Sequence, residues 1–208
     1  MSGQVQWKTR VANATVTISG LGARGVLVPG GFILTAAHCI KWDGTGGLAL
    51  GDHSIETIKT MRGDCFRVST VAADPFSDIA VLGPADAQEF LQDYLAFEKW
   101  HEDTDAVPIS KNLPRSNKKL DVHILTHDQG WIEATIGDYS AGPHRSGRLW
   151  LESDREINGG TSGSAIVNSW GQLIGVVSQS SDSNGSGPQP IAKLALPRWV
   201  WTLVLRAS

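Results

Sequence analysis

The sequence has little cysteine: Cys39 and Cys65 are the two cysteines among its 208 residues, so it can form at most one disulfide bridge. Small secreted domains usually carry several such bridges, so this scarcity predicts a reducing, cytoplasmic compartment and two free, mostly buried thiols. The opening residues, MSGQVQWKTR, include no apolar run of the kind found in secretory signals. Runs of about 18 apolar residues are also missing, and we therefore expect neither a membrane-spanning helix nor a membrane partner.

Charge of one sign is not in excess either. The formal net charge is −3, which gives no reason to expect nucleic acid or an anionic membrane as a partner. The two histidines of the segment LDVHILTH, His123 and His127, are four residues apart. That spacing would put both on one face of a helix, but the segment has the pattern of a strand, so we expect no metal site and no cofactor.

What the sequence does have is glycine, 23 residues in all, together with short apolar runs. Runs such as GVLVP, GFILTAA and DIAVL, and later GWIEATIG, SAIVN and QLIGVVSQ, have the length and turn-rich spacing of strands. We expect an all-β sandwich or barrel protein, a single unit over 1–208 with one half over 11–90 and another over 113–195. The composition of 84–112 predicts a helical link, and PRWVWTLVLRAS predicts a short C-terminal helix over 197–206.

Three positions point to nucleophilic chemistry. Ser162 lies in GGTSGSAIV, where glycines allow the N–H groups of Gly160 and Ser162 to turn toward one point and bind an oxyanion. His38 follows a strand-like run that ends in two alanines. Asp78 opens the apolar run DIAVL, which offers it no charged neighbour. A glycine–serine turn, a structural histidine and a surface aspartate are the alternative interpretations.

The segment TAAHC, Thr35 to Cys39, resembles the histidine motif of the trypsin/chymotrypsin clan of serine proteases. DIAVL is similar to the acid motif of that family, and the chain order His38, Asp78, Ser162 is the order found in chymotrypsin. The resemblance implies a chymotrypsin-like fold of two six-stranded antiparallel β-barrels. It also implies a serine endopeptidase that acts on protein or peptide substrates with this catalytic triad.

The sequence departs from the digestive enzymes of this family before the nucleophile. Thr161 stands where their motif G-D-S-G-G has an aspartate, and the I-V-G-G type of N-terminus that pairs with this aspartate is missing. Activation by propeptide cleavage is therefore not expected. The form G-x-S-G-S, Gly160 to Ser164, resembles bacterial glutamyl endopeptidases, and the spacing I-N-x-G-x-S resembles the Deg/HtrA group, although no PDZ domain follows. A proteolytic effector switched on by a regulatory partner, and a non-catalytic binding module on a protease scaffold, are the competing hypotheses.

Two residues before the nucleophile compete as determinants of specificity. By resemblance, Glu156 takes the place of the acid at the base of the trypsin pocket, and a buried carboxylate there would favour Arg or Lys before the scissile bond. The alternative is a solvated loop carboxylate paired with Arg155. Ile157 instead indicates a shallow apolar pocket for small aliphatic residues, which we rank second. A preference for Glu comes last, because the strand QLIGVVSQ has no histidine to neutralise it. The end of this strand, Ser178, Gln179 and Ser180, should pair with the substrate as an added strand.

Overall fold

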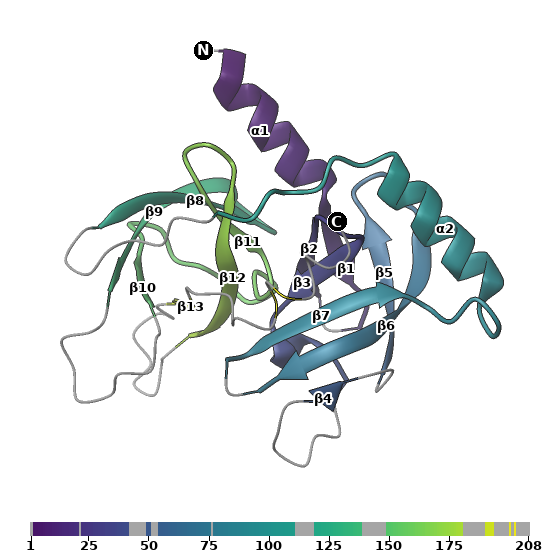
Figure 1. The fold of residues 1–208 in the computed structure, drawn as a ribbon. Helices are drawn as coiled ribbons and strands as arrows, with labels where there is room; N and C mark the ends of the chain where they lie inside the picture. Colours follow the sequence, from purple (N-terminus) through teal and green to yellow (C-terminus); the bar gives the residue numbers. More distant parts are fainter. Residues whose placement is uncertain are drawn as a thin grey trace.

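The structure, a computed structural model, describes residues 2–20, 22–41, 49–50, 54–75, 77–110, 119–138, 149–180, 190–193, 200 and 202. Its strands form two β structures side by side, with the helix α1 (Ser2–Asn13) at their junction and the helix α2 (Leu91–Glu102) on the outside of the first (Figure 1). The expected all-β fold class is therefore confirmed.

Seven strands make the first structure: β1 (Thr15–Ile18), β2 (Ala23–Val28), β3 (Phe32–Thr35), β4 (Ala49–Leu50), β5 (Ile55–Thr60), β6 (Cys65–Asp74) and β7 (Ile79–Pro84). They are hydrogen-bonded in the order β4-β6-β5-β1-β2-β3-β7, and a further pairing of β6 with β7 closes six of them into an antiparallel barrel. Side chains along β5 are exposed and buried in turn, as a strand with one face toward a core requires. The first barrel is filled by aliphatic side chains such as Ile18, Leu27, Ile33, Leu34 and Leu82.

Six strands make the second structure: β8 (Leu120–Thr126), β9 (Gly130–Asp138), β10 (Leu149–Glu152), β11 (Ala165–Asn168), β12 (Leu173–Ser180) and β13 (Pro190–Lys193). Their order is β10-β9-β8-β11-β12-β13. The end strands β10 and β13 come close, but no backbone ladder joins them within the described residues. The second half is thus a curled six-stranded sheet, where a closed barrel was expected. A separate apolar cluster that includes Val122, Ile124, Ile132, Ile136 and Ile166 forms its core.

The N-terminal helix corrects one expectation from the sequence. The run VANATVTIS predicts a strand from residue 11, but residues 11–13 belong to α1, and β1 begins at Thr15. Trp7, Val11 and Ala14 are all buried, and their spacing is that of one face of a helix. The strand prediction was wrong there because the alternating pattern suits both periods, and packing on this helix face decides between them.

The helical link is confirmed by α2. Phe97 and Trp100 of this helix are buried, and their rings lie 6.1 and 5.8 Å from the ring of Phe66 on β6. Arg67 of the same strand forms an ion pair of 2.7 Å with Asp93. These contacts fix α2 on the outer face of the first barrel.

The expected C-terminal helix over 197–206 lies largely outside the described residues. Val200 and Thr202 are described, both are helical, and Val200 is fully buried. No helix in the described part of the chain is long and apolar enough to cross a membrane.

The two cysteines are free thiols, as expected. Cys39 is buried, but Cys65 is exposed, so the expectation of burial was wrong for the second thiol. The physical reason is its position, since Cys65 begins β6 directly after the exposed turn between β5 and β6.

Candidate active site

His38 lies just beyond the end of β3, in the short 3-10 turn η1 (Ala37–Cys39). The small side chains of Ala36 and Ala37 before it are almost completely buried, so the end of the strand packs closely against its surroundings. The N–H of Cys39 donates to the carbonyl oxygen of Ala36 at 3.0 Å and closes the turn. The imidazole keeps 30% of its surface exposed, and a substrate can therefore reach it.

Asp78 directly precedes β7, and its carboxylate contacts His38. Oδ1 accepts a hydrogen bond of 3.0 Å from the backbone N–H of His38, and the two oxygens lie 3.1 and 2.9 Å from Nδ1 of the imidazole. The φ angle of Asp78 is 53°, in the left-handed region that residues other than glycine rarely adopt. An Nδ1–H that donates to Asp78 leaves Nε2 of His38 free, which is the orientation that a general base needs.

Ser178 of β12 completes the surroundings of the Asp78 carboxylate. Its hydroxyl donates a hydrogen bond to Oδ2 of Asp78. Ser178 is buried and comes from the second β structure, so the carboxylate is held from both halves of the molecule. The sequence placed Ser178 at the substrate edge alone. No local motif signals its contact with Asp78, because that contact depends on how the two halves pack.

These contacts shift the ionisation of both partners. The hydrogen bond to Asp78 raises the pKa of His38 from 6.5 to about 10, with a smaller contribution from Cys39 and against the opposing effect of burial. Burial acts to raise the pKa of Asp78, but hydrogen bonds from His38 and Ser178 outweigh it and hold this pKa below its ordinary value. Asp78 is therefore ionised at neutral pH and can stabilise a protonated imidazole at His38.

The loop that carries Ser162 is docked against β2 and β3 of the first barrel. The carbonyl oxygen of Ser162 accepts a hydrogen bond of 2.8 Å from the N–H of Arg24. At Gly163, where φ is 80°, a Cβ atom would lie 1.9 Å from the carbonyl oxygen of Arg24 and 2.5 Å from Oγ1 of Thr35, so only glycine fits. Because Thr35 is three residues before His38, this close approach brings the serine loop to the end of β3.

The backbone before Ser162 turns sharply. The N–H of Thr161 donates to the carbonyl oxygen of Asn158 at 3.3 Å, and Gly160 has a φ of 86°. Among the described residues, no backbone acceptor takes the N–H of Gly160 or of Ser162, so both groups are available to an oxyanion. A hydrogen bond from the Ser162 hydroxyl to His38 is not found in that part of the chain; such bonds often tighten only when substrate binds.

The turn between β8 and β9 supports this loop from another side. Nδ2 of Asn158 donates to Oδ2 of Asp128 at 2.6 Å, and Nε2 of Gln129 donates to the carbonyl oxygen of Glu156 at 2.8 Å. The hydrogen bond from Asn158 is the main cause of the lowered pKa of Asp128. The segment before the nucleophile is therefore tied to one turn at two points.

Glu156 and Ile157, the expected specificity residues, lie in different environments. Glu156 is exposed, and no ion pair of the described residues includes it. The expectation of a buried carboxylate at this position was therefore wrong. An exposed Glu156 is solvated and needs no cationic partner. Ile157 is buried in the apolar core of the second sheet. The part that either residue plays in specificity stays a prediction.

The strand β12 has an unpaired edge beside the serine loop. Toward β11, the last backbone hydrogen bonds run from Val177 to Ser164 and from Gly163 to Val177. Beyond them, residues 178–180 have no strand partner on that side within the described part of the chain. The side chains of Gln179 and Ser180 lie outside that part. An extended peptide can pair with this edge by strand addition.

The two histidines of the segment LDVHILTH lie in different surroundings. His123 is buried on β8, whereas His127 lies in the turn that follows, and a Cβ atom on Gly160 would be 3.5 Å from its ring. Within the described residues, no group of His, Cys, Asp or Glu side chains could hold a metal ion.

The sequence matches a known family along most of this site. The profile of the trypsin-like peptidase domain covers residues 23–176, which include His38, Asp78 and Ser162. The chain belongs to the trypsin-like peptidase domain family.

Relatives of the trypsin-like chain include bacterial proteases. It is 28% identical over 166 residues to the serine endoprotease DegS of Haemophilus influenzae, and this match covers 79% of the chain but 43% of the relative. Among solved structures, the serine endoprotease from Yersinia pestis has a TM-score of 0.60 at 22% identity, with 98% of this chain and 65% of that chain covered. The Rv3671c protease in its inactive form has a TM-score of 0.61 at 17% identity, with 98% and 93% covered. These likenesses confirm the chymotrypsin-like fold.

Proposed function

We propose that the chain hydrolyses peptide bonds by acyl transfer, with Ser162 as nucleophile, His38 as general base and Asp78 as the residue that orients the base. The observation that carries this proposal is the Asp78 carboxylate, which holds the Nδ1 side of His38 at 2.9 Å. The close packing of Gly163 on Arg24 and Thr35 supports it, because it brings the serine loop to the same strand end.

The groups then act in sequence. Ser162 Oγ attacks the substrate carbonyl carbon while Nε2 of His38 takes its proton, and the N–H groups of Gly160 and Ser162 bind the developing oxyanion. His38 gives the proton to the leaving amine as the peptide bond breaks and an acyl-enzyme remains. Water, activated by the same His38, hydrolyses the acyl-enzyme. The free edge of β12 holds the substrate backbone during both steps.

Activity without N-terminal cleavage is part of this proposal. Thr161 is fully buried and carries no charge, so a newly freed N-terminal amine would find no carboxylate there. We expect the intact chain to be competent, either on its own or once a regulatory partner binds. We also place it in the cytoplasm, a proposal that rests on its two free thiols. For the residue before the scissile bond, we keep the ranking of basic first and small aliphatic second.

A fluorophosphonate probe tests this function, because it labels only an activated serine. The intact chain should be labelled, Ser162→Ala should lose labelling and peptide hydrolysis by several orders of magnitude, and Ser164→Ala is the matched control. Labelling that survives in Ser162→Ala, or is lost in Ser164→Ala instead, overturns the choice of nucleophile. Labelling that appears only after N-terminal clipping overturns the activation proposal alone. No labelling under any condition favours a non-catalytic binding module.

A further inference from the structure

A second hollow lies on the outer face of the second sheet and shares no residue with the candidate active site. It has a volume of about 470 Å³, and its lining is rich in carboxylates. The acidic residues that line it are Asp121, Glu133, Glu152 and Asp154. We call this hollow, with its lining residues on β8, β9, β10 and the segment after β10 and with Ser169 beside them, the acidic groove.

The strand register explains why these carboxylates gather. Asp121 on β8 is paired with Thr135 on β9, which is paired in turn with Glu152 on β10. In the neighbouring row, His123 is paired with Glu133. Paired residues of adjacent strands project to the same face of a sheet, so both rows present their side chains to the acidic groove.

Most of this negative charge is not neutralised by the chain itself. Glu152 forms an ion pair with Lys119 at the margin. Asp121, Glu133 and Asp154 take part in none of the ion pairs of the described residues, and no lysine or arginine lines the groove. Close, unpaired carboxylates repel one another, and a cation from outside relieves this repulsion.

His123 adds a second observation at the same place. It lines the acidic groove and is 6% exposed, yet its Nδ1 has no hydrogen-bond partner among the described residues. Burial and the nearby charge of Lys8 lower the pKa of His123, so the ring is neutral and does not balance the carboxylates. A buried ring nitrogen without a hydrogen-bond partner is costly. A bound ligand that donates a hydrogen bond to this nitrogen would remove that cost.

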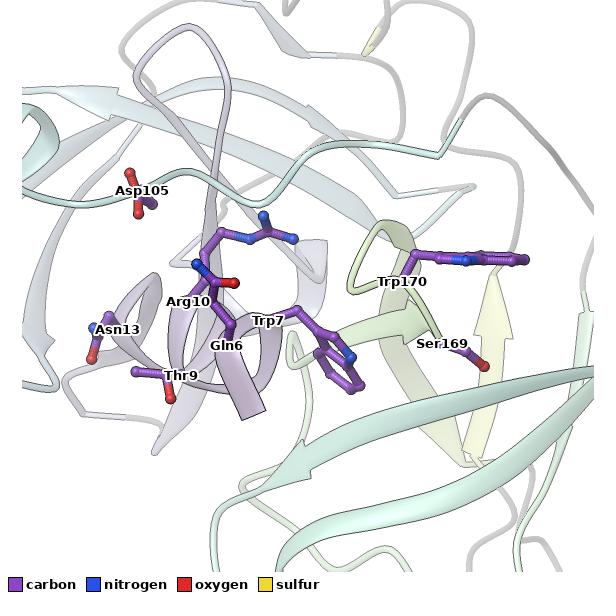
Figure 2. A pocket seen from close by; sticks show the side chains of 8 residues that line it. All are labelled: Gln6, Trp7, Thr9, Arg10, Asn13, Asp105, Ser169 and Trp170. Carbon is purple, nitrogen blue, oxygen red and sulfur yellow. The ribbon is translucent and has the colours of Figure 1, made fainter. Parts of the chain in front are cut away.

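An exposed indole stands at the end of the groove. Ser169 lines both the acidic groove and the neighbouring pocket that contains Trp170. Trp170 is 72% exposed, and Figure 2 shows its ring pointing away from Arg10. The turn is preformed, because Oδ1 of Asn168 accepts hydrogen bonds of 3.0 Å from the N–H groups of Trp170 and Gln172. A solvent-facing indole on a preformed turn is a platform for an ammonium or guanidinium group.

We propose that the acidic groove and Trp170 together bind a lysine- or arginine-rich segment of another protein. The carboxylates pair with successive basic side chains, and the indole face takes one more cation. Lys8 already shows this type of contact, since its ammonium lies 5.6 Å from the ring centroids of Trp7 and Trp131. A metal ion is the weaker occupant, because no metal-binding group is found within the described residues.

Binding of a fluorescein-labelled octalysine peptide, followed by fluorescence anisotropy at low salt, tests the proposal. The Ser162→Ala chain is used so that the peptide stays intact, and the result does not depend on catalysis. Asp121→Asn/Glu133→Gln/Asp154→Asn should weaken binding about tenfold, from three exposed ion pairs. Trp170→Ala should weaken it about threefold by removing the cation–π contact.

A matched control separates a site from general electrostatic attraction. Glu89→Gln/Glu98→Gln/Glu102→Gln removes the same number of charges around α2, on the first barrel, and should leave the affinity unchanged. Equal weakening by both triple variants, or full affinity in the groove variant, overturns the proposal. Displacement of the peptide by millimolar Ca²⁺ at constant ionic strength overturns it in favour of a metal site.

Discussion

Asp78 is the residue on which contacts from three places converge. It receives the backbone N–H and the imidazole of His38, and the hydroxyl of Ser178. Its φ of 53° is uncommon for a residue with a side chain, and contacts of this number can hold it there. The same contacts that hold the uncommon backbone conformation of Asp78 therefore also fix the orientation and the charge state of His38, the proposed base.

The raised pKa of His38 predicts that activity increases toward alkaline pH. A general base works in its deprotonated form, so kcat/KM should rise as the pH increases from 6.5 toward about 10. Asp78→Asn removes the carboxylate whose hydrogen bond raises this pKa, so the rise should move to lower pH while the maximal rate falls about 10⁴-fold. Profiles of kcat/KM against pH for both proteins measure the two effects. A midpoint that does not move in the variant contradicts the role given to Asp78.

At the scale of elements, the turn between β8 and β9 positions the loop that carries the proposed oxyanion donors. Asp128 accepts a hydrogen bond from Asn158, and Gln129 donates one to the carbonyl oxygen of Glu156. From β2 of the first barrel, Nη1 of Arg24 donates to the carbonyl oxygen of Leu125 at 3.5 Å. The turn thus supports the loop before Ser162, and β8, which leads into the turn, contacts β2. A loop fixed at its base keeps its N–H groups aimed without reorganisation, which is what transition-state stabilisation requires.

Asp128→Ala should lower kcat about tenfold with little change in KM. This is less than the roughly 10²-fold or greater effect of deleting an oxyanion donor, because the N–H groups remain and only their support is lost. Steady-state kinetics on a peptide substrate measure the split, and Asp105→Ala, at an exposed position outside the site, is the control. A rise in KM at constant kcat would instead place Asp128 in substrate binding.

The same elements show which features of the fold and the site could be predicted from the sequence. Local motifs such as TAAHC and GGTSGS were enough to single out His38, Asp78 and the serine loop, which the structure brings together; their catalytic roles stay a prediction. The partnership of Asp78 with Ser178 joins residues 100 positions apart, and no local pattern encodes it. The strand predicted at residues 11–13 failed for the same reason, since the burial of Val11 in the core depends on packing with distant parts of the chain.

At the scale of the whole molecule, α1 ties the two β structures together. Trp7 lies 5.1 Å from the ring of His123 and 5.3 Å from that of Trp131, both on the second sheet. A Cβ atom on Gly171 would lie 2.5 Å from Cβ of Trp7, so the turn between β11 and β12 sits directly on the helix. Val11, on the same face, packs in the core cluster that contains the first barrel.

Trp7→Ala should lower the free energy of unfolding by roughly 3–5 kcal/mol, the usual cost of removing a large buried aromatic side chain. Because the lost contacts bridge the two halves, the urea transition should also broaden or divide into two steps. Gln6→Ala, an exposed neighbour on the same helix, should change the stability by no more than about 0.5 kcal/mol. Equal midpoints for Trp7→Ala and the parent protein would show that the helix is not a structural tie.

The division of the site between two β structures has a consequence for biosynthesis. His38 and Asp78 emerge from the ribosome with the first barrel, whereas Ser162 and Ser178 emerge roughly 80 to 100 residues later, on the second sheet. Domains commonly fold as they are synthesised, so the first barrel can form while the nucleophile and the donor to Asp78 do not yet exist. With the proposed mechanism, a nascent chain is therefore inert toward itself and its neighbours, and hydrolytic competence begins only after translation has passed the end of β12.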